Sequence, residues 1–138
     1  MINNLKYAVM FPGQGSQYVG MAQDLYENSE KAKDLFHQAE LITNMPLRDL
    51  MFKGPDEVLK QTNNTQPCLQ IANIALYQAF LEKVNNHLPS YVCGHSAGEY
   101  SALYAAGVLS FEDSLDLIVN RGKLMSEVDA GSMLAILN

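Results

Sequence analysis

Apolar residues along the chain fall into two kinds of segment: short continuous runs, and longer stretches in which they recur every three or four positions. The runs YAVMF (7–11) and SYVC (90–93) have the length of strands, and the first is closed by Pro12 and Gly13. Short continuous apolar runs bounded by turn residues are typical of buried strands. A third run, GSMLAILN (131–138), also predicts a strand.

The longer stretches predict helices, because apolar side chains three or four residues apart share one face of an α-helix. Ser110 and Asp113 resemble a capping box at the start of the last helix, and Asn64 or Thr65 is expected to cap the longest one. The predicted helices cover residues 29–42, 46–52, 55–59, 64–84, 98–106 and 109–128.

Strands that alternate with helices predict an α/β fold in which a parallel sheet is doubly wound, with helices on both faces. Only two strands precede the run at 131–138, whereas parallel sheets normally contain several strands. We therefore expect these residues to form part of a larger sheet.

Composition and charge narrow the class of protein. Apolar residues make up 48% of the chain and charged residues 17%, which is sufficient for a packed core. The net charge of −6 argues against a nucleic-acid partner, because phosphate binding favours a basic surface. An acidic chain also repels anionic substrates, so local cations must hold any such substrate.

Cysteine usage and the N-terminal segment predict a cytoplasmic protein. Cys68 and Cys93 are isolated, so they form neither a secreted disulfide framework nor a metal-ligand motif. The apolar run near the N-terminus is too short for a signal peptide, and no stretch reaches the length of a membrane span. We expect no metal and no membrane partner.

The segment VCGHSAGEY (92–100) places two glycines symmetrically around one serine. The pattern of Gly94, Ser96 and Gly98 matches the nucleophile elbow, a sharp turn from strand to helix. The backbone crowds together two residues before and after such a serine, so a Cβ there would clash. Ser96 is a candidate nucleophile, and the Ala97 N–H is a candidate oxyanion donor. A glycine-flanked turn with an ordinary serine is the alternative.

No histidine in the chain is a convincing general base for this serine. His37 falls on a helix, where an exposed position is expected, and His87 falls in a loop. His95 is adjacent to Ser96, but neighbouring side chains at a strand end point to opposite sides. We expect His95 to pack beneath the turn.

Arg121 is a second candidate site residue. Its helical neighbours three and four positions away are all apolar: Leu117, Ile118, Leu124 and Met125. A charge on an apolar face is costly unless a carboxylate meets it, and the planar guanidinium suits a bidentate carboxylate. That carboxylate would belong either to a substrate or to an Asp or Glu elsewhere in the chain. A side chain that reaches water is the remaining alternative.

A glycine-rich loop follows the first predicted strand and contains Gln14. Ligands bind beyond the carboxyl ends of parallel strands, and Ser96 leaves its own strand at the same edge. The glycines on both sides of Gln14 allow a close approach to a substrate, although a simple turn fits the same residues. The loop lacks the lysine and the spacing of a phosphate-binding P-loop.

Four motifs stand in order along nearly the whole chain: FPGQGSQYVGM (11–21), NTQP (64–67), GHSAGEYSALYAAGVLS (94–110) and NRGKLM (120–125). Together they resemble the malonyl-CoA:acyl carrier protein transacylase family, the acyltransferases of fatty acid and polyketide synthesis. The combination is far more specific than any one motif.

The resemblance implies a ping-pong acyl transfer. Ser96 would take malonyl from coenzyme A as an ester and pass it to the phosphopantetheine thiol of acyl carrier protein. Gln14 and the Ala97 N–H would form the oxyanion hole. Malonyl-CoA and the carrier protein are the substrates, and no bound cofactor is implied.

The same resemblance assigns the remaining site residues. Arg121 matches the arginine that grips the free carboxylate of malonyl, so an acetyl group should be rejected. Gln66 and His95 are candidates for lining the pocket.

The resemblance also implies an α/β-hydrolase-like large subdomain over residues 1–128, with residues 129–138 as the first strand of a ferredoxin-like small subdomain. Family members are longer, and the catalytic histidine would lie beyond this chain. We expect a truncated product or a split gene whose C-terminal half must associate, with negligible transfer by this chain alone. A serine esterase or thioesterase, and a non-catalytic module that binds acyl carrier protein, remain alternatives.

Overall fold

The computed structural model describes residues 6–128 and residue 136. The predicted strand at 131–138, apart from residue 136, and the predicted subdomain boundary at 129 fall outside these residues. The described elements are β1 (Ala8–Phe11), α1 (Gln23–Asn28), α2 (Glu30–Thr43), α3 (Leu47–Phe52), α4 (Asp56–Leu59), α5 (Thr62–Lys83), β2 (Tyr91–Gly94), α6 (Gly98–Ala105) and α7 (Phe111–Ser126).

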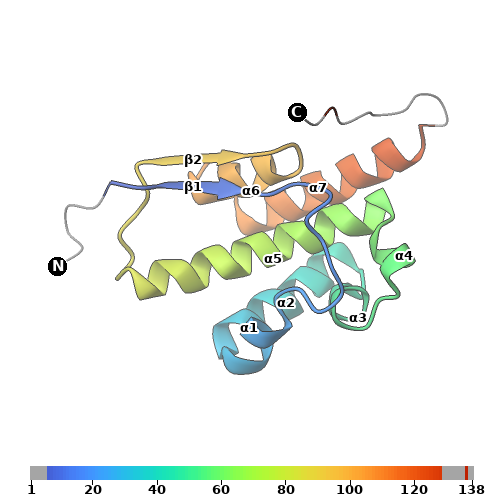
Figure 1. The fold of residues 1–138 in the computed structure, drawn as a ribbon, viewed down its shortest axis with the longest axis horizontal. Helices are drawn as coiled ribbons and strands as arrows, with labels where there is room; N and C mark the ends of the chain where they lie inside the picture. The colour runs from blue at the N-terminus through green and yellow to red at the C-terminus, as the bar shows by residue number, and fades with distance from the viewer. Residues whose placement is uncertain (1–5, 129–135, 137–138) are drawn as a thin grey trace.

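β1 and β2 form a two-stranded parallel sheet within the described part of the chain. Ala8 pairs with Tyr91 and Phe11 with Gly94, so both strands end at the same edge. Figure 1 shows the sheet along the top of the molecule, with α5 beneath it. The predicted mixed α/β fold with a parallel sheet is confirmed.

The described helices cover one face of this sheet, whereas the sequence predicted helices on both. Phe11 is buried against Tyr77 of α5 and Ala102 of α6. The side chains that alternate with it along both strands are exposed. The difference arises because α5 and α6 both pack on the Phe11 side of the sheet.

Serine side chains cap two helices, and the cap at Ser110 was predicted from the sequence. Ser29 Oγ accepts a hydrogen bond from Ala32 N–H at the start of α2, over 3.2 Å. Ser110 Oγ accepts one from Asp113 N–H at the start of α7, over 2.9 Å. Each cap satisfies a backbone N–H that has no partner within its helix. The short helix α1 was not predicted from the sequence.

The predicted cap of α5 is wrong, because this helix begins at Thr62 and contains both proposed cap residues. Thr65 Oγ1 donates to the Leu59 carbonyl oxygen over 2.5 Å, and Asn64 Nδ2 donates to the Val58 carbonyl oxygen over 3.0 Å. These side chains therefore satisfy carbonyls at the end of α4 and link the two helices.

The helix α5 forms the centre of the fold. Every residue from 65 to 75 is buried, as expected of a helix that is covered on all sides. It packs against α2, α3, α6 and α7. The largest fully buried apolar side chains of this helix and of the elements around it are Phe36, Leu47, Met51, Leu59, Ile71, Ile74, Leu115 and Ile118.

Candidate active site

The turn between β2 and α6 has the geometry of a nucleophile elbow. Ser96 has a φ of 52°, in the left-handed region that residues with a side chain rarely adopt. A Cβ on Gly94 would lie closer than 3.0 Å to the Gly98 backbone, and a Cβ on Gly98 would be equally crowded by the Phe11 carbonyl oxygen. The crowding predicted from the two glycines is confirmed, and Ser96 is exposed.

The loop after β1 packs directly against this elbow. The His95 N–H donates to the Phe11 carbonyl oxygen over 3.0 Å, and a Cβ on Gly13 would overlap the His95 carbonyl oxygen. Gln14 follows on the loop with an exposed side chain, and its Nε2 donates to Thr62 Oγ1 over 3.2 Å. The structure thus brings Gln14 to the sheet edge that carries the elbow.

A buried polar network ties the same loop to the helices behind it. Asn73 Nδ2 donates to the Pro12 carbonyl oxygen over 3.3 Å and to Ser101 Oγ over 3.1 Å. Ser101 Oγ in turn donates to Gln70 Oε1 over 2.7 Å. Since buried hydrogen-bonded groups are costly to separate, this network fixes the loop relative to α5 and α6.

Arg121 reaches the elbow from α7. Its Nη2 donates to Ser96 Oγ over 3.0 Å, and its Nη1 donates to Gln66 Oε1 over 2.7 Å. The guanidinium carbon lies 5.9 Å from the centre of the Tyr100 ring. Tyr100 is on α6, four positions after Ser96. No ion pair in the described part of the chain involves Arg121. Its charge therefore faces an amide, a hydroxyl and a ring.

Gln66 is fully buried and is held at both ends of its amide. Oε1 accepts from Arg121, and Nε2 donates to Met125 Sδ over 3.4 Å. Because sulfur is a weak acceptor, the second contact orients the amide more than it stabilises the fold.

Tyr100 and Met125 were not predicted as site residues. Met125 lies four positions after Arg121 on α7, and Tyr100 lies four positions after Ser96, in the first turn of the helix that follows the elbow. These spacings were the available signal.

The apolar surroundings predicted for Arg121 are present only in part. Ile118 is fully buried, and the other three neighbours are exposed. These are Leu117, Leu124 and Met125. The buried side of α7 includes Gly122, where a Cβ would lie 3.2 Å from Asn63 Cα of α5. Arg121 therefore lies at the border of the α5–α7 contact and not inside an apolar face.

The sequence matches known acyltransferases over almost its whole length. A family model described as "Acyl transferase domain" matches residues 9–138. Malonyl CoA-acyl carrier protein transacylase of Bacillus subtilis is 44% identical over 135 residues, which cover 96% of this chain and 42% of the relative. The protein of the same name from Staphylococcus aureus strain MRSA252 gives the same figures.

The chain belongs to the malonyl-CoA:acyl carrier protein transacylase family.

Solved structures of this transacylase family share the fold. An acyl carrier protein S-malonyltransferase from Vibrio cholerae superposes with a TM-score of 0.84 at 42% identity, over 92% of this chain and 42% of that one. A malonyl-transacylase in complex with its type II PKS acyl-carrier protein gives a TM-score of 0.83 at 41% identity, over 89% and 40% of the two chains. This transacylase-family chain thus spans about 42% of the length of the relatives it matches.

The described histidines leave Ser96 without a base. The hydrogen bond of Ser96 Oγ within the described residues comes from Arg121, and none joins it to a histidine. His95 is exposed, which corrects the expectation that it packs beneath the turn. It continues the alternation of β2 and so follows Cys93 on the uncovered side of the strand. It borders a hollow of about 460 Å³ together with Met10, Phe11, Pro12, Cys93 and Gly94.

The remaining two histidines and the two cysteines differ in burial. His37 is exposed on α2, and His87 lies half-buried in the loop before β2. Burial raises the pKa of the Cys68 thiol to about 12, whereas Cys93 is exposed.

Within residues 6–128 and 136, no group of three or more His, Cys, Asp or Glu side chains is arranged to hold a metal ion. None of the described helices combines the length and the apolar character needed to cross a bilayer.

Proposed function

We propose that Ser96 accepts a malonyl group from coenzyme A and passes it to the phosphopantetheine thiol of acyl carrier protein. The observation that supports this most is the position of Arg121, whose guanidinium donates to the Ser96 hydroxyl and has no carboxylate partner among the described residues. The names of the matched relatives are consistent with the same reaction.

The arginine explains why the acyl group would be malonyl. A half-buried guanidinium without a carboxylate retains unused hydrogen-bonding capacity, and a bidentate carboxylate is the ligand that fits its planar fork. In malonyl the free carboxylate is separated from the reacting carbonyl carbon by one methylene. Arg121 lies within hydrogen-bond distance of Ser96 Oγ, so one acyl group of this length can meet both residues.

Two groups are suited to stabilise the oxyanion. No hydrogen bond in the described part of the chain involves the Ala97 N–H, which lies at the N-terminus of α6, where backbone donors favour negative charge. Gln14 is exposed on the facing loop, and its amide donates to the Thr62 hydroxyl, a partner that a substrate oxygen can replace. We assign both groups to the oxyanion hole.

The reaction would run in two balanced steps. Ser96 Oγ attacks the thioester carbonyl of malonyl-CoA, a C–O bond forms, the C–S bond breaks, and the serine proton passes through a base to the coenzyme A thiolate. The carrier protein thiol then attacks the ester carbonyl, a new C–S bond forms, the C–O bond to Ser96 breaks, and the proton of the attacking thiol passes through the base to the serine oxygen. Pocket roles for Gln66, which orients Arg121, and for His95 belong to the same proposal.

The base must come from outside the described residues, because no described histidine is bonded to Ser96. A serine without a general base is a weak nucleophile. We therefore expect negligible transfer by the 138 residues alone and restoration of transfer when the family's remaining part is supplied, either in the same chain or as a separate half.

The test is acylation of Ser96 by labelled malonyl-CoA in a chimera that joins these residues to the unmatched part of the Bacillus subtilis relative. Intact mass and peptide mapping should find the malonyl ester on Ser96 and none in the Ser96→Ala chimera. Release of the label to water instead of to holo acyl carrier protein would favour a thioesterase. Carrier protein binding without any ester would favour a non-catalytic module.

A further inference from the structure

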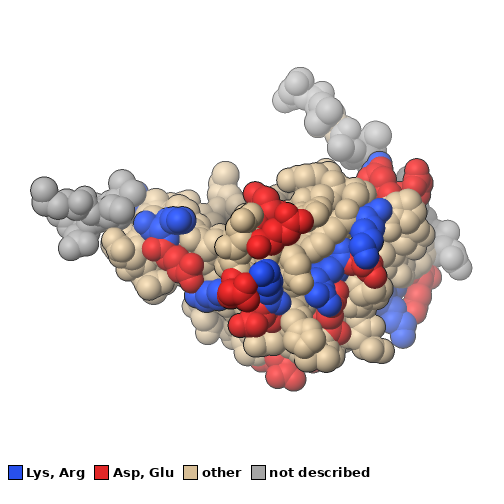
Figure 2. All heavy atoms as spheres, turned by 90° about the horizontal axis from the view of Figure 1, so that it is seen from below, with Lys and Arg blue, Asp and Glu red and all other residues tan. Residues whose placement is uncertain are grey.

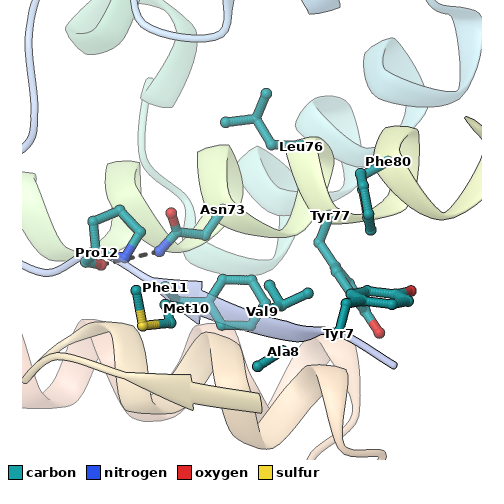
Figure 3. Close-up of a pocket in the computed structure, with 10 residues that line it drawn as sticks. All are labelled: Tyr7, Ala8, Val9, Met10, Phe11, Pro12, Asn73, Leu76, Tyr77 and Phe80. Atoms are coloured by element: carbon teal, nitrogen blue, oxygen red, sulfur yellow. Dashed lines mark hydrogen bonds between the residues drawn. The ribbon is translucent and has the colours of Figure 1, made fainter. Parts of the chain in front are cut away.

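The loop after β1 is anchored to the helices on either side of Gln14. Before Gln14, the Pro12 carbonyl oxygen accepts a hydrogen bond from Asn73 Nδ2 of α5, over 3.3 Å (Figure 3). After it, the Gly20 N–H donates to the Met51 carbonyl oxygen over 2.7 Å. Gln14 is much nearer along the chain to the anchor at Pro12, so this anchor sets its position more closely.

The same amide of Asn73 is bonded to α6, the helix whose N-terminus carries the Ala97 N–H. Its Nδ2 also donates to Ser101 Oγ over 3.1 Å, and that hydroxyl donates to Gln70 Oε1 over 2.7 Å. The nitrogen has two protons, one for the loop and one for α6. All three side chains are buried, so water does not compete for these bonds. We call Gln70, Asn73 and Ser101 the buried network.

The main chain of the loop also lies against α6 at this point. A Cβ on Gly98 would lie 2.3 Å from the Phe11 carbonyl oxygen and 2.8 Å from the Pro12 carbonyl oxygen. Ser101 follows Gly98 by one helical turn and so lies on the same face of α6. The Pro12 carbonyl is thus bonded to the buried network and close to the backbone of the elbow, and a shift of this carbonyl changes the distance between loop and elbow.

None of the ion pairs among the described residues reaches this loop. They join side chains within residues 30–82. The helical side of the molecule, seen from below in Figure 2, carries lysines and arginines interspersed with aspartates and glutamates. Ion pairs that are exposed to water contribute little to stability, whereas buried neutral hydrogen bonds hold a defined direction. The buried network is therefore the polar link that fixes the loop.

We propose that Asn73 is a positioning residue for the oxyanion hole and that the rest of the buried network holds its amide in place. The two proposed oxyanion donors, Gln14 and the Ala97 N–H, belong to different segments and must meet one oxygen atom. Such donors are effective only when they are in place before the negative charge develops. Asn73 keeps the Pro12 carbonyl, and with it Gln14, at a fixed distance from the elbow. The inference rests on the oxyanion roles proposed above and assigns a role to side chains that do not touch the substrate.

Two buried serines provide a matched comparison in the chimera with the Bacillus subtilis remainder. Ser101→Ala removes the hydroxyl that holds Asn73, whereas Ser114→Ala removes one that donates to the Phe111 carbonyl oxygen of its own helix, over 2.8 Å. Both serines are fully buried, so we expect similar losses in melting temperature. For Ser101→Ala, kcat of malonyl transfer should fall at least about tenfold and KM for malonyl-CoA should stay within about twofold, because Arg121 is not moved. Ser114→Ala should change neither constant.

A double-mutant cycle tests whether Asn73 acts through Gln14. Asn73→Leu keeps a similar size and removes both donors, and we expect kcat to fall at least about tenfold. In the Gln14→Ala background the amide to be positioned is gone, so the same substitution should lower kcat less than about twofold. Ser101→Ala gives the same cycle with a smaller change should Asn73→Leu fail to fold. Equal losses in both backgrounds, or a KM that rises as much as kcat falls, would overturn the proposal.

Hydrogen exchange in the 138-residue chain tests the anchor without catalysis. The His95 N–H is bonded to the Phe11 carbonyl oxygen, directly before the anchor at Pro12. We expect this amide to exchange at least about tenfold faster in Ser101→Ala than in Ser114→Ala. Equal exchange rates would contradict the proposal. Faster exchange together with a chimera that forms no malonyl ester would support the anchoring of the loop by Asn73 and contradict the proposed acyl transfer.

Discussion

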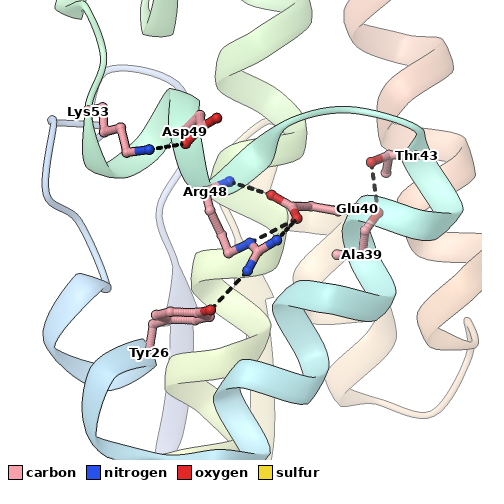
Figure 4. Close-up of polar contacts among 7 residues, drawn as sticks. All are labelled: Tyr26, Ala39, Glu40, Thr43, Arg48, Asp49 and Lys53. Atoms are coloured by element: carbon pink, nitrogen blue, oxygen red, sulfur yellow. Dashed lines mark hydrogen bonds and ion pairs between the residues drawn. The ribbon is translucent and has the colours of Figure 1, made fainter.

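Arg48 and Arg121 each lie over a tyrosine ring, but only Arg48 is paired with a carboxylate among the described residues. Arg48 on α3 lies over the Tyr26 ring at 5.7 Å, and its Nη1 donates to the Tyr26 hydroxyl over 2.9 Å. Its Nε donates to Glu40 over 2.8 Å, and the Glu40 carboxylate also accepts the Arg48 backbone N–H (Figure 4). These hydrogen bonds raise the pKa of the guanidinium, with Glu40 as the larger cause.

Arg121 also lies over a tyrosine ring, but its other partners are an amide and a hydroxyl. Around Arg48 a carboxylate of the chain itself pairs with the guanidinium, whereas around Arg121 no carboxylate of the described residues does. The difference teaches that a candidate binding arginine is recognised by the lack of a carboxylate partner within the chain more than by its burial.

The largest loss of stability is expected when a side chain is added to the backbone of the elbow at Gly94. Gly94→Ala would place a Cβ closer than 3.0 Å to the backbone of Gly98, so the turn must open. We expect the free energy of unfolding to fall by about 3 kcal/mol or more, measured by urea denaturation. The control is Gly107→Ala, where no atom lies within 4 Å and only the positive φ is strained. A smaller loss for Gly94→Ala than for this control would contradict the crowding.

In the helical region, Arg48→Ala leaves the Glu40 carboxylate without its partner. We expect a loss of about 1–2 kcal/mol in the free energy of unfolding, since the pair is only partly shielded from water. Arg48→Lys keeps the charge and should recover part of this loss. No change in the urea midpoint of Arg48→Ala would show that the ion pair is not structural.

A substitution at Ser96, whose backbone is strained, is expected to raise the free energy of unfolding instead of lowering it. Ser96→Gly removes the side chain from a left-handed backbone and should raise the free energy of unfolding by up to about 1 kcal/mol, after the flexibility of glycine is counted. Asn44→Gly, at a φ of 51° in the helical region, should gain less because asparagine tolerates this conformation. Equal gains at the two positions would argue against strain stored for function.

The smallest effect on stability is expected from Arg121→Ala. Removal of this side chain breaks no ion pair in the described structure, and water that enters the vacated, half-exposed space can replace its hydrogen bond to Gln66 Oε1. The free energy of unfolding should therefore change by no more than about 0.5 kcal/mol. Thermal and urea denaturation beside Arg48→Ala would check this. A loss as large as that of Arg48→Ala would make Arg121 a structural residue.

Local patterns in the sequence predicted most of the fold. Apolar spacing predicted the two described strands and nearly all the helices. The paired glycines predicted the turn at Ser96, because a Cβ at either position would clash with backbone close by. The start of α5 was missed, since Thr65 bonds to the end of α4 instead of capping its own helix.

The composition of the site could be predicted only in part. Ser96 and Arg121 were singled out separately, but their hydrogen bond joins the turn after β2 to α7, a contact between distant segments that helical spacing cannot predict. The uncovered face of the sheet was not foreseen, because alternation of strands and helices does not tell which face each helix covers.

The most direct test of the account is the ratio of the dissociation constants of acetyl-CoA and malonyl-CoA for the 138-residue chain, by calorimetry. We predict that malonyl-CoA binds at least about tenfold more tightly, as expected when one charge-assisted contact is gained, and that Arg121→Ala brings the ratio close to one. An unchanged ratio in Arg121→Ala, or equal affinity for both thioesters in the unmodified chain, would contradict the claim that Arg121 is kept for the carboxylate of the substrate.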